Sequence, residues 1–160
     1  MKIKNIVQED FVNYKKPSMF IIFPKCSFKC DRECGRAICQ NSALINSPDI
    51  EISTEKIVEK YINNPITKSI VIGGLEPFDS IEDLDSLLRA FREKTKDEIV
   101  IYTGYTEEEI KDLINVYKLK YEPFIIKYGR FIPDCESHYD DVLGINLASP
   151  NQYAKRYENE

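Results

Sequence analysis

Short apolar runs alternate along the chain with longer stretches in which apolar residues recur every three or four positions. The short runs are rich in isoleucine, valine and phenylalanine and end at turn residues, which is typical of buried strands. They predict four strands, over residues 18–23, 69–74, 98–104 and 123–129. The longer amphipathic stretches predict three helices, over residues 53–64, 79–95 and 106–118.

Two of the predicted helices begin with a capping pattern. Thr106 and Glu109 form a T-x-x-E box, in which each side chain accepts a hydrogen bond from the backbone N–H of the other residue. Asp79 and Glu82 have the same spacing at the start of another helix. The last part of the chain is irregular, and we expect one more short strand near 142–146.

Strands that alternate with helices predict the α/β class with a mostly parallel sheet. The chain has 160 residues, whereas a complete eight-stranded barrel takes about 250. We therefore expect a single domain over residues 1–160, folded as an open partial (β/α) barrel or as a doubly wound sheet. In either fold the carboxyl ends of the strands meet at one edge, where ligands bind. The cysteine loop, the GGLEP turn and the TGYT turn each follow a strand and should converge there.

The composition restricts the possible partners and the location of the protein. The net charge is −5, and the chain has no basic stripe, which argues against nucleic acid as a partner. The longest apolar run, residues 19–23, is too short to cross a bilayer, and the charged N-terminal stretch lacks the apolar segment of a signal peptide. We therefore expect a cytoplasmic protein with no membrane partner.

Four cysteines, Cys26, Cys30, Cys34 and Cys39, lie in one short segment, and Cys135 stands apart. In a reducing compartment such a cluster more often binds metal than forms disulfides, and five cysteines cannot all pair. Zinc usually takes thiolates from C-x2-C pairs, whereas the gaps here are three, three and four residues. An iron–sulfur cluster also binds thiolates and tolerates wider gaps. The cysteines alone leave both interpretations open.

The surroundings of the cysteines resemble the radical S-adenosylmethionine superfamily, and within it the small activating proteins of anaerobic ribonucleotide reductase. Cys26-x3-Cys30 after the first strand and the GG-x-EP turn after the second are similar to the superfamily pattern. The glycine turn alone is a weak signal, because an ordinary turn before a helix explains it as well. The segments 39–41 (CQN) and 102–110 (YTGYTEEEI) resemble elements of the activating proteins. The resemblance extends from about residue 3 to residue 152.

The chain departs from the family pattern at two places. Eight residues separate Cys30 from Cys39 where the family usually has two, and this insertion contains Cys34. Leu75 is an additional residue in the glycine turn. Because CQN resembles the end of the family motif, the resemblance implies Cys26, Cys30 and Cys39 as ligands of a [4Fe-4S] cluster. The triad Cys26, Cys30 and Cys34 is the alternative.

The resemblance also implies a mechanism. Three cysteines leave one iron of the cluster free to bind S-adenosylmethionine, which the reduced cluster cleaves to methionine and a 5′-deoxyadenosyl radical. The implied contacts are with the adenine from Ile38 and with the amino group from Gly73, Gly74, Glu76 and Pro77. No catalytic acid or base is implied. The implied partners are the large subunit of anaerobic ribonucleotide reductase, which receives a glycyl radical, and an electron donor such as a flavodoxin or ferredoxin.

Three functions are therefore compatible with the sequence. The first is an oxidoreductase of the radical S-adenosylmethionine type that activates anaerobic ribonucleotide reductase. The second is a radical enzyme of the same superfamily that acts on another peptide or on a small molecule. The third is a zinc-stabilised α/β binding module without catalysis.

Overall fold

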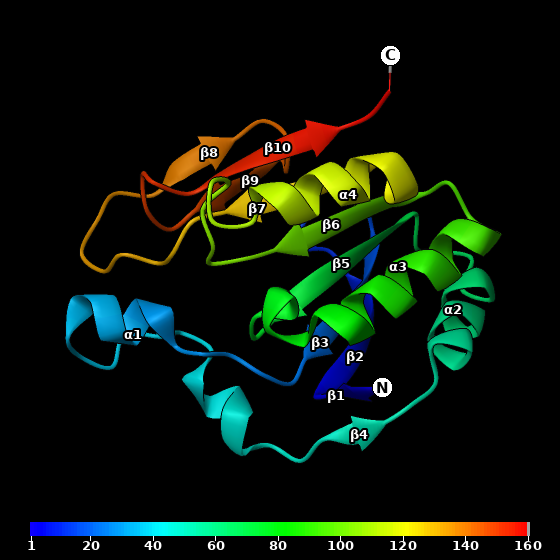
Figure 1. Ribbon diagram of the computed structural model, residues 1–160, viewed down its shortest axis with the longest axis horizontal. Coiled ribbons are helices and arrows are strands. Elements are labelled where there is room, and N and C mark those ends of the chain that lie inside the picture. The colour runs from blue at the N-terminus through cyan, green and yellow to red at the C-terminus, as the bar shows by residue number, and fades with distance from the viewer. Residues whose placement is uncertain (160) are drawn as a thin grey trace.

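The protein is built around a six-stranded sheet, and the computed structural model describes residues 1–159. The inner four strands run parallel, and each edge strand runs antiparallel to its neighbour. Across the sheet the strands are β10 (Tyr153–Tyr157), β7 (Phe124–Tyr128), β6 (Glu98–Tyr102), β5 (Ser69–Gly74), β3 (Ser18–Phe23) and β2 (Asn5–Asp10) (Figure 1).

The sheet confirms the predicted α/β class. It is mixed, because only its centre is parallel, and within residues 1–159 the two edge strands do not pair to close a barrel. The four predicted strands are confirmed as β3, β5, β6 and β7. The edge strands β2 and β10 are absent from the predicted set, because an edge strand is partly exposed and tolerates the polar and charged residues that both contain.

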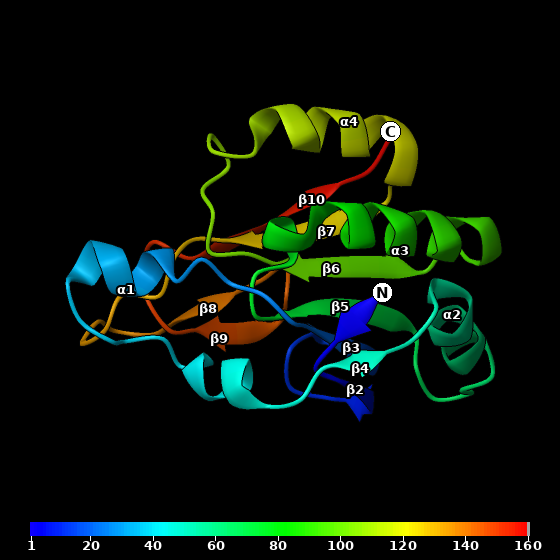
Figure 2. The ribbon, with the colours of Figure 1, turned by 60° about the horizontal axis from the view of Figure 1, so that its bottom comes forward.

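Three helices cover one face of the sheet, and they correspond to the three that the periodicity predicts. They are α2 (Thr54–Ile62), α3 (Ile81–Lys94) and α4 (Lys111–Tyr121) (Figure 2). Successive side chains of a strand point to opposite faces, so every second strand residue packs against these helices. The main core joins strand residues such as Ile70, Ile72, Ile99 and Ile101 to residues of the helices such as Leu88.

A hairpin of β8 (His138–Asp140) and β9 (Ile145–Leu147) lies on the opposite face (Figure 2). The short strand predicted near 142–146 is thus shifted toward the C-terminus. The hairpin face has a smaller core, made of Tyr14, Val71, Val100, Ile125, Leu143 and Leu147. Two residues further toward the carboxyl ends of the parallel strands, a second row of residues points to this same face of the sheet. It consists of Ile22, Gly73, Tyr102 and Lys127.

The cysteine loop lies beyond the carboxyl ends of the parallel strands. In Figure 2 it is on the side to which the arrow of β6 points. It contains α1 (Lys29–Cys34) and is followed by the short helix η1 (Ser42–Asn46). The strands β1 (Lys2–Ile3) and β4 (Ile50–Glu51) pair with each other, and the short helix η2 (Pro77–Ser80) precedes α3. In the described part of the chain, no helix combines the length and the apolar character needed to span a membrane.

Of the two predicted capping patterns, the Thr106–Glu109 box forms its hydrogen bonds but does not start the helix, because α4 begins only at Lys111, after Ile110, and no side chain caps it. The other pattern, at Asp79 and Glu82, is wrong. The N–H of Thr106 donates to Glu109 Oε2 at 2.8 Å, and the N–H of Glu109 donates to Thr106 Oγ1 at 3.3 Å. At the start of α3 the flanking residue is Ser80, and no side chain caps the helix. Asp79 instead binds two other loops, because η2 displaces it from the first turn of α3.

Candidate metal centre

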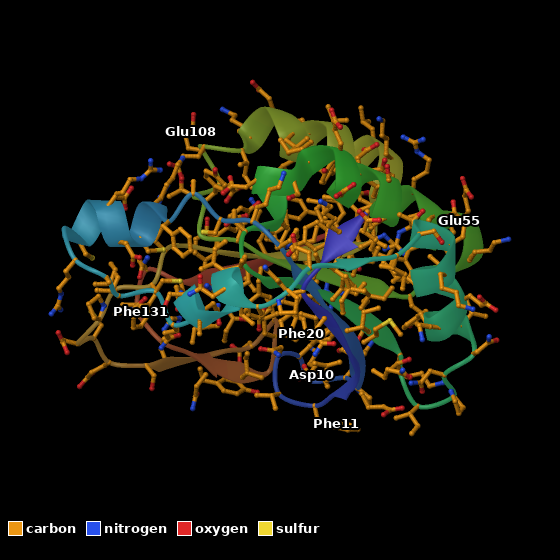
Figure 3. The ribbon with its side chains drawn as sticks, turned by 90° about the horizontal axis from the view of Figure 1, so that it is seen from below. Asp10, Phe11, Phe20, Glu55, Glu108 and Phe131 are labelled. Carbon is orange, nitrogen blue, oxygen red and sulfur yellow. The ribbon has the colours of Figure 1, made fainter. Side chains whose placement is uncertain are left out.

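A cavity of about 680 Å³ opens at the carboxyl edge of the parallel strands, on the hairpin face of the sheet. Its wall includes Cys26, Cys30 and Cys39, together with aromatic side chains such as Phe20 and Phe131, which are labelled in Figure 3. The predicted convergence of the three turns is confirmed, since Gly74, Leu75, Glu76, Thr103 and Gly104 also line the cavity.

The cysteines fall into two groups. Cys26, Cys30 and Cys39 are partly buried, whereas Cys34 and Cys135 are exposed and are not among the described residues that line the cavity. Among residues 1–159, no three acidic, histidine or cysteine side chains are grouped closely enough to hold a single metal ion. The fold therefore brings three of the four clustered cysteines to one cavity, with space between them.

Burial affects the chemistry of the two cysteines that flank the start of α1. It raises the pKa of Cys26 to about 11, and it also raises the pKa of Cys30. The N–H of Phe28 donates to Cys26 Sγ at 3.2 Å, which favours the thiolate and partly opposes the effect of burial. Both thiols are therefore protonated near neutral pH in the metal-free protein, and a metal must displace their protons on binding.

Glu76 connects the three turns that form the cavity edge. Its N–H donates to the carbonyl oxygen of Lys25 at 2.7 Å, at the start of the cysteine loop. Its carboxylate accepts hydrogen bonds from Thr103 Oγ1 (2.8 Å) and the N–H of Gly104 (2.8 Å), both after β6. The same carboxylate accepts from the N–H of Phe78 at 3.1 Å and so caps η2. One residue thereby holds the ends of three strands together.

Asp79 forms a second connection between the same turns. Its Oδ2 accepts a hydrogen bond from the N–H of Ser27 at 2.7 Å, and its Oδ1 accepts from the Tyr105 hydroxyl at 2.6 Å. The acidic residues of the GGLEP turn and η2 therefore fix the cysteine loop on one side and the TGYT turn on the other.

Lys127 is a cavity residue that the sequence motifs do not identify. It lies on β7 in the row of Tyr102, with only 8% of its surface exposed. Its ammonium donates to the carbonyl oxygen of Gly129 at 3.2 Å, and burial lowers its pKa to about 8. The only available signal was a single charge inside the apolar run PFIIKYG. Glu76 and Lys127 are the only acidic or basic residues among the described residues that line the cavity.

The other predicted contact residues have different positions. Gly74 lines the cavity at φ 86°, and a side chain there would overlap that of Ile22. Gly73 is covered, since an added Cβ would lie 3.1 Å from Tyr102 Cβ and 3.3 Å from Phe20 Cε2. Gly73, Ile38 and Pro77 are not among the described residues that line the cavity. Pro77 is buried in η2, and Ile38 is partly buried in the cysteine loop.

Arg130 attaches α1 to the rest of the molecule. Its guanidinium forms ion pairs with Glu33 of α1 (3.2 Å) and with Glu109 of the turn before α4 (2.6 Å). Lys29 of α1 approaches the same Glu109 carboxylate at 3.8 Å and lies 4.2 Å from the centre of the Tyr105 ring. These contacts place the cysteine-bearing helix against the TGYT turn.

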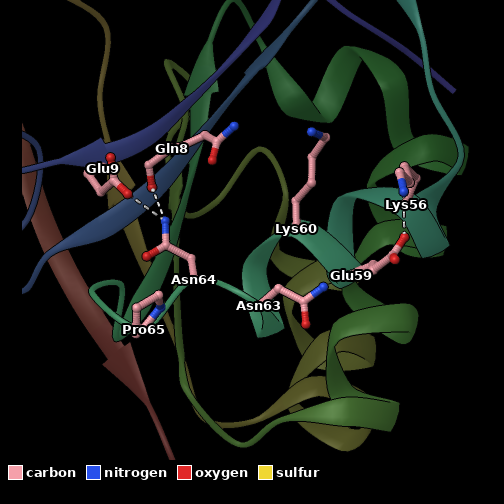
Figure 4. Close-up of a pocket in the computed structure, with 8 residues that line it drawn as sticks. All are labelled: Gln8, Glu9, Lys56, Glu59, Lys60, Asn63, Asn64 and Pro65. Carbon is pink, nitrogen blue, oxygen red and sulfur yellow. Dashed lines mark hydrogen bonds and ion pairs between the residues drawn. The ribbon is translucent and has the colours of Figure 1, made fainter.

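A second hollow, of about 360 Å³, lies between β2 and the end of α2 (Figure 4). Its wall is polar, and several of its groups already bind one another. Asn64 Nδ2 donates to Glu9 Oε1 at 2.8 Å, and Lys56 pairs with Glu59 at 2.8 Å. None of the cysteines or predicted contact residues lines this hollow.

The fold presents three cysteines, a residue type that binds metal clusters, at the carboxyl edge of the parallel strands. Residues 18–144 match the family of 4Fe-4S single cluster domains, and the chain belongs to this family. The matched residues include the four parallel strands and the whole cysteine loop. No curated protein and no solved structure matches the chain. The family favours an iron–sulfur cluster over zinc as the group bound here.

Titration of Glu76 should make the stability of the metal-free protein depend on pH. Burial raises the pKa of Glu76 from 4.5 to about 7, so the folded state holds the proton more tightly than the unfolded state. The stabilisation is complete below about pH 4.5 and is lost as the pH rises to about 7, a change on the order of 3 kcal/mol. Urea unfolding at a series of pH values measures it.

Glu76→Gln should remove this decrease, whatever its effect on absolute stability, because the amide does not titrate. The control is Glu108→Gln, at an exposed position that is labelled in Figure 3, and it should keep the decrease. An unchanged pH dependence in Glu76→Gln would assign the effect to another group.

Proposed function

We propose that this protein is a radical S-adenosylmethionine enzyme of the activating type, which generates a glycyl radical on anaerobic ribonucleotide reductase. One observation carries the proposal: three cysteines, and not four, share a cavity with one buried acid and one buried base. A purely structural cluster needs a protein ligand for each iron, whereas a catalytic metal site keeps an open position. The family membership supports the cluster, and the sequence resemblance supports the activity.

Cys26, Cys30 and Cys39 are the proposed ligands. The residues fit a [4Fe-4S] cluster, because thiolates are its usual ligands and the cavity between the three side chains is roomy. The N–H of Phe28 that donates to Cys26 Sγ is the kind of hydrogen bond that adjusts the reduction potential of such clusters. Cys34, exposed on α1, is left without a ligand role in this assignment.

The remaining part of the cavity accommodates the second cofactor. S-adenosylmethionine carries an ammonium and a carboxylate on its methionine end, and the cavity offers Glu76 to the first and Lys127 to the second. Gly74 allows the left-handed turn beside Ile22 that brings its backbone to the cavity wall, while Gly73, Pro77 and Ile38 shape the surrounding turns. A reduced cluster bound at this site would supply one electron to S-adenosylmethionine, which would be cleaved to methionine and a 5′-deoxyadenosyl radical.

The substrate is the glycine of a partner protein in this proposal. Apart from Glu76 and Lys127, the described residues of the cavity wall are neutral, and many are apolar, such as Val12, Leu44 and Leu147. Such a wall suits an uncharged peptide loop. A flavodoxin or ferredoxin is the proposed electron donor, and the cytoplasm is the proposed location. A radical enzyme that acts on another peptide is the alternative that the same cavity supports.

The ligand assignment predicts the outcome of single cysteine substitutions. Alanine at Cys26, Cys30 or Cys39 removes a ligand, and each variant should hold less than about a tenth of the wild-type iron and sulfide after anaerobic reconstitution. Cys34→Ala is the matched control and should keep the wild-type content. An intact cluster in Cys39→Ala, together with its loss in Cys34→Ala, would reverse the assignment.

Cleavage of S-adenosylmethionine tests the reaction type. The reconstituted protein, incubated without oxygen with dithionite and S-adenosylmethionine, should release 5′-deoxyadenosine and methionine in equal amounts. Addition of an anaerobic ribonucleotide reductase should then produce an organic radical signal on that partner. A fully loaded cluster that releases no 5′-deoxyadenosine would sink both radical interpretations, and release without a radical on the reductase would favour another substrate.

Lys127→Met separates binding from stability. Methionine has a similar shape without the buried charge, so the metal-free variant should be at least as stable as the wild type in urea. Loss of a charged hydrogen bond to the cofactor carboxylate should raise the KM for S-adenosylmethionine roughly 10- to 100-fold. Lys118→Met, at an exposed position of α4, is the control and should change neither quantity. An unchanged KM in Lys127→Met would exclude this contact.

A further inference from the structure

The cysteine loop must reverse its direction to bring Cys39 back to Cys26 and Cys30. The chain enters α1 through Phe28, which has a φ of 53°, and leaves it through Gly35, which has a φ of 68°. The Cβ position at Gly35 faces open space, so this glycine serves the left-handed turn and not packing. The reversal makes the return of Cys39 possible but does not specify where it stops.

Asp31 is the residue that specifies the end point. Its Oδ1 accepts hydrogen bonds from the N–H of Ile38 and the N–H of Cys39, both at 2.8 Å. Asp31 directly follows Cys30, so the side chain next to one proposed ligand holds the backbone of another. Bonds from backbone N–H groups to a carboxylate are stronger than those between neutral groups.

We propose that Asp31 is a positioning residue that selects Cys39, and not Cys34, as the third ligand of the cluster. The inference rests on the proposed ligand set and extends it. Without the Asp31 carboxylate, the segment after Gly35 would lose the hydrogen bonds from the N–H groups of Ile38 and Cys39, and Cys34 on α1 would become a competing thiol. The stretch between Cys30 and Cys39 thus contains both the additional cysteine, Cys34, and the residue that excludes Cys34 from the site, Asp31.

The other contacts of the loop act elsewhere. Glu33 pairs with Arg130 and holds α1 itself, while Arg36 pairs with Asp134 at 3.3 Å between two exposed side chains. The carbonyl oxygen of Cys39 accepts a hydrogen bond from the N–H of Ser42 at 3.4 Å, within the turn that leads to η1. Among residues 1–159, Asp31 is the only side chain found to bind the amide of Cys39.

Thiol labelling of the metal-free protein tests the positioning role without any cluster. The full-length reduced protein is treated with a maleimide, and the rate at each cysteine is read by mass spectrometry of peptides. In the wild type, Cys39 should react more slowly than the exposed Cys34 and Cys135. In Asp31→Ala the rate at Cys39 should rise roughly ten-fold, because two hydrogen bonds to a carboxylate are lost. The rate at Cys135 should not change.

Two further variants make the result specific. Asp31→Asn keeps an oxygen at the Oδ1 position and should keep Cys39 slow to within about two-fold. Arg32→Ala alters the next residue of α1, which is exposed, and should behave as the wild type. If Asp31→Ala also accelerates the partly buried Cys26, which Asp31 does not bind, the structure is generally loosened, and Asp31→Asn then decides. The proposal would be overturned if the rate at Cys39 were unchanged in Asp31→Ala. It would also be overturned if Asp31→Ala were generally loosened and Cys39 reacted equally fast in Asp31→Asn.

Reconstitution provides the second arm. Asp31→Ala should either hold less than half of the wild-type iron or depend on Cys34 for its cluster, so that Asp31→Ala with Cys34→Ala holds still less. Asp31→Asn should restore the wild-type content. Full loading of the double variant would overturn the selection of Cys39 by Asp31. If the wild type itself assembled no cluster, the proposed function would fail, while the labelling would still decide the position of Cys39.

Discussion

The buried carboxylate of Glu76 is the constraint on which the site depends. Parallel pairing places the ends of β3, β5 and β6 at one edge, but it does not fix the irregular turns that follow them. The carboxylate of Glu76 accepts hydrogen bonds from Thr103 and Gly104 on one side, while the backbone N–H of the same residue donates to the carbonyl oxygen of Lys25 on the other. Because Glu76 is buried, the loss of any of these bonds would leave a polar atom without a partner, which is costly in free energy.

The two faces of the sheet are covered differently. The helices bury the apolar residues of one face, and helices and strands together form the larger core there. The β8–β9 hairpin covers only part of the other face, and the next row of strand residues, which includes Tyr102 and Lys127, faces the cavity. Burial of the Lys127 ammonium disfavours its charged form, which lowers its pKa and reduces the stability of the fold. Groups with strongly shifted pKa values are more frequent at functional sites than elsewhere in proteins.

Much of the fold was predictable, and the failures have physical reasons. The inner strands are buried on both sides, so their apolar runs predicted them directly. The edge strands β2 and β10 have polar, partly exposed residues and carry no such signal. Asp79 has the spacing of a helix cap, yet its carboxylate binds Ser27 and Tyr105, because η2 places it where the loops meet. Spacing along the chain does not distinguish these roles.

For the site, the sequence by itself determined the residue types: clustered cysteines after one strand, a glycine turn with an acid after the next, and a cluster family that fits both. Only the tertiary structure decided which of them meet. It brings Cys39 to the cavity, leaves Cys34 exposed, covers Gly73 and adds Lys127. The physical reason is that convergence depends on contacts between distant segments, such as Asp31 with the backbone of Cys39, and these form only when the strands and loops have packed together.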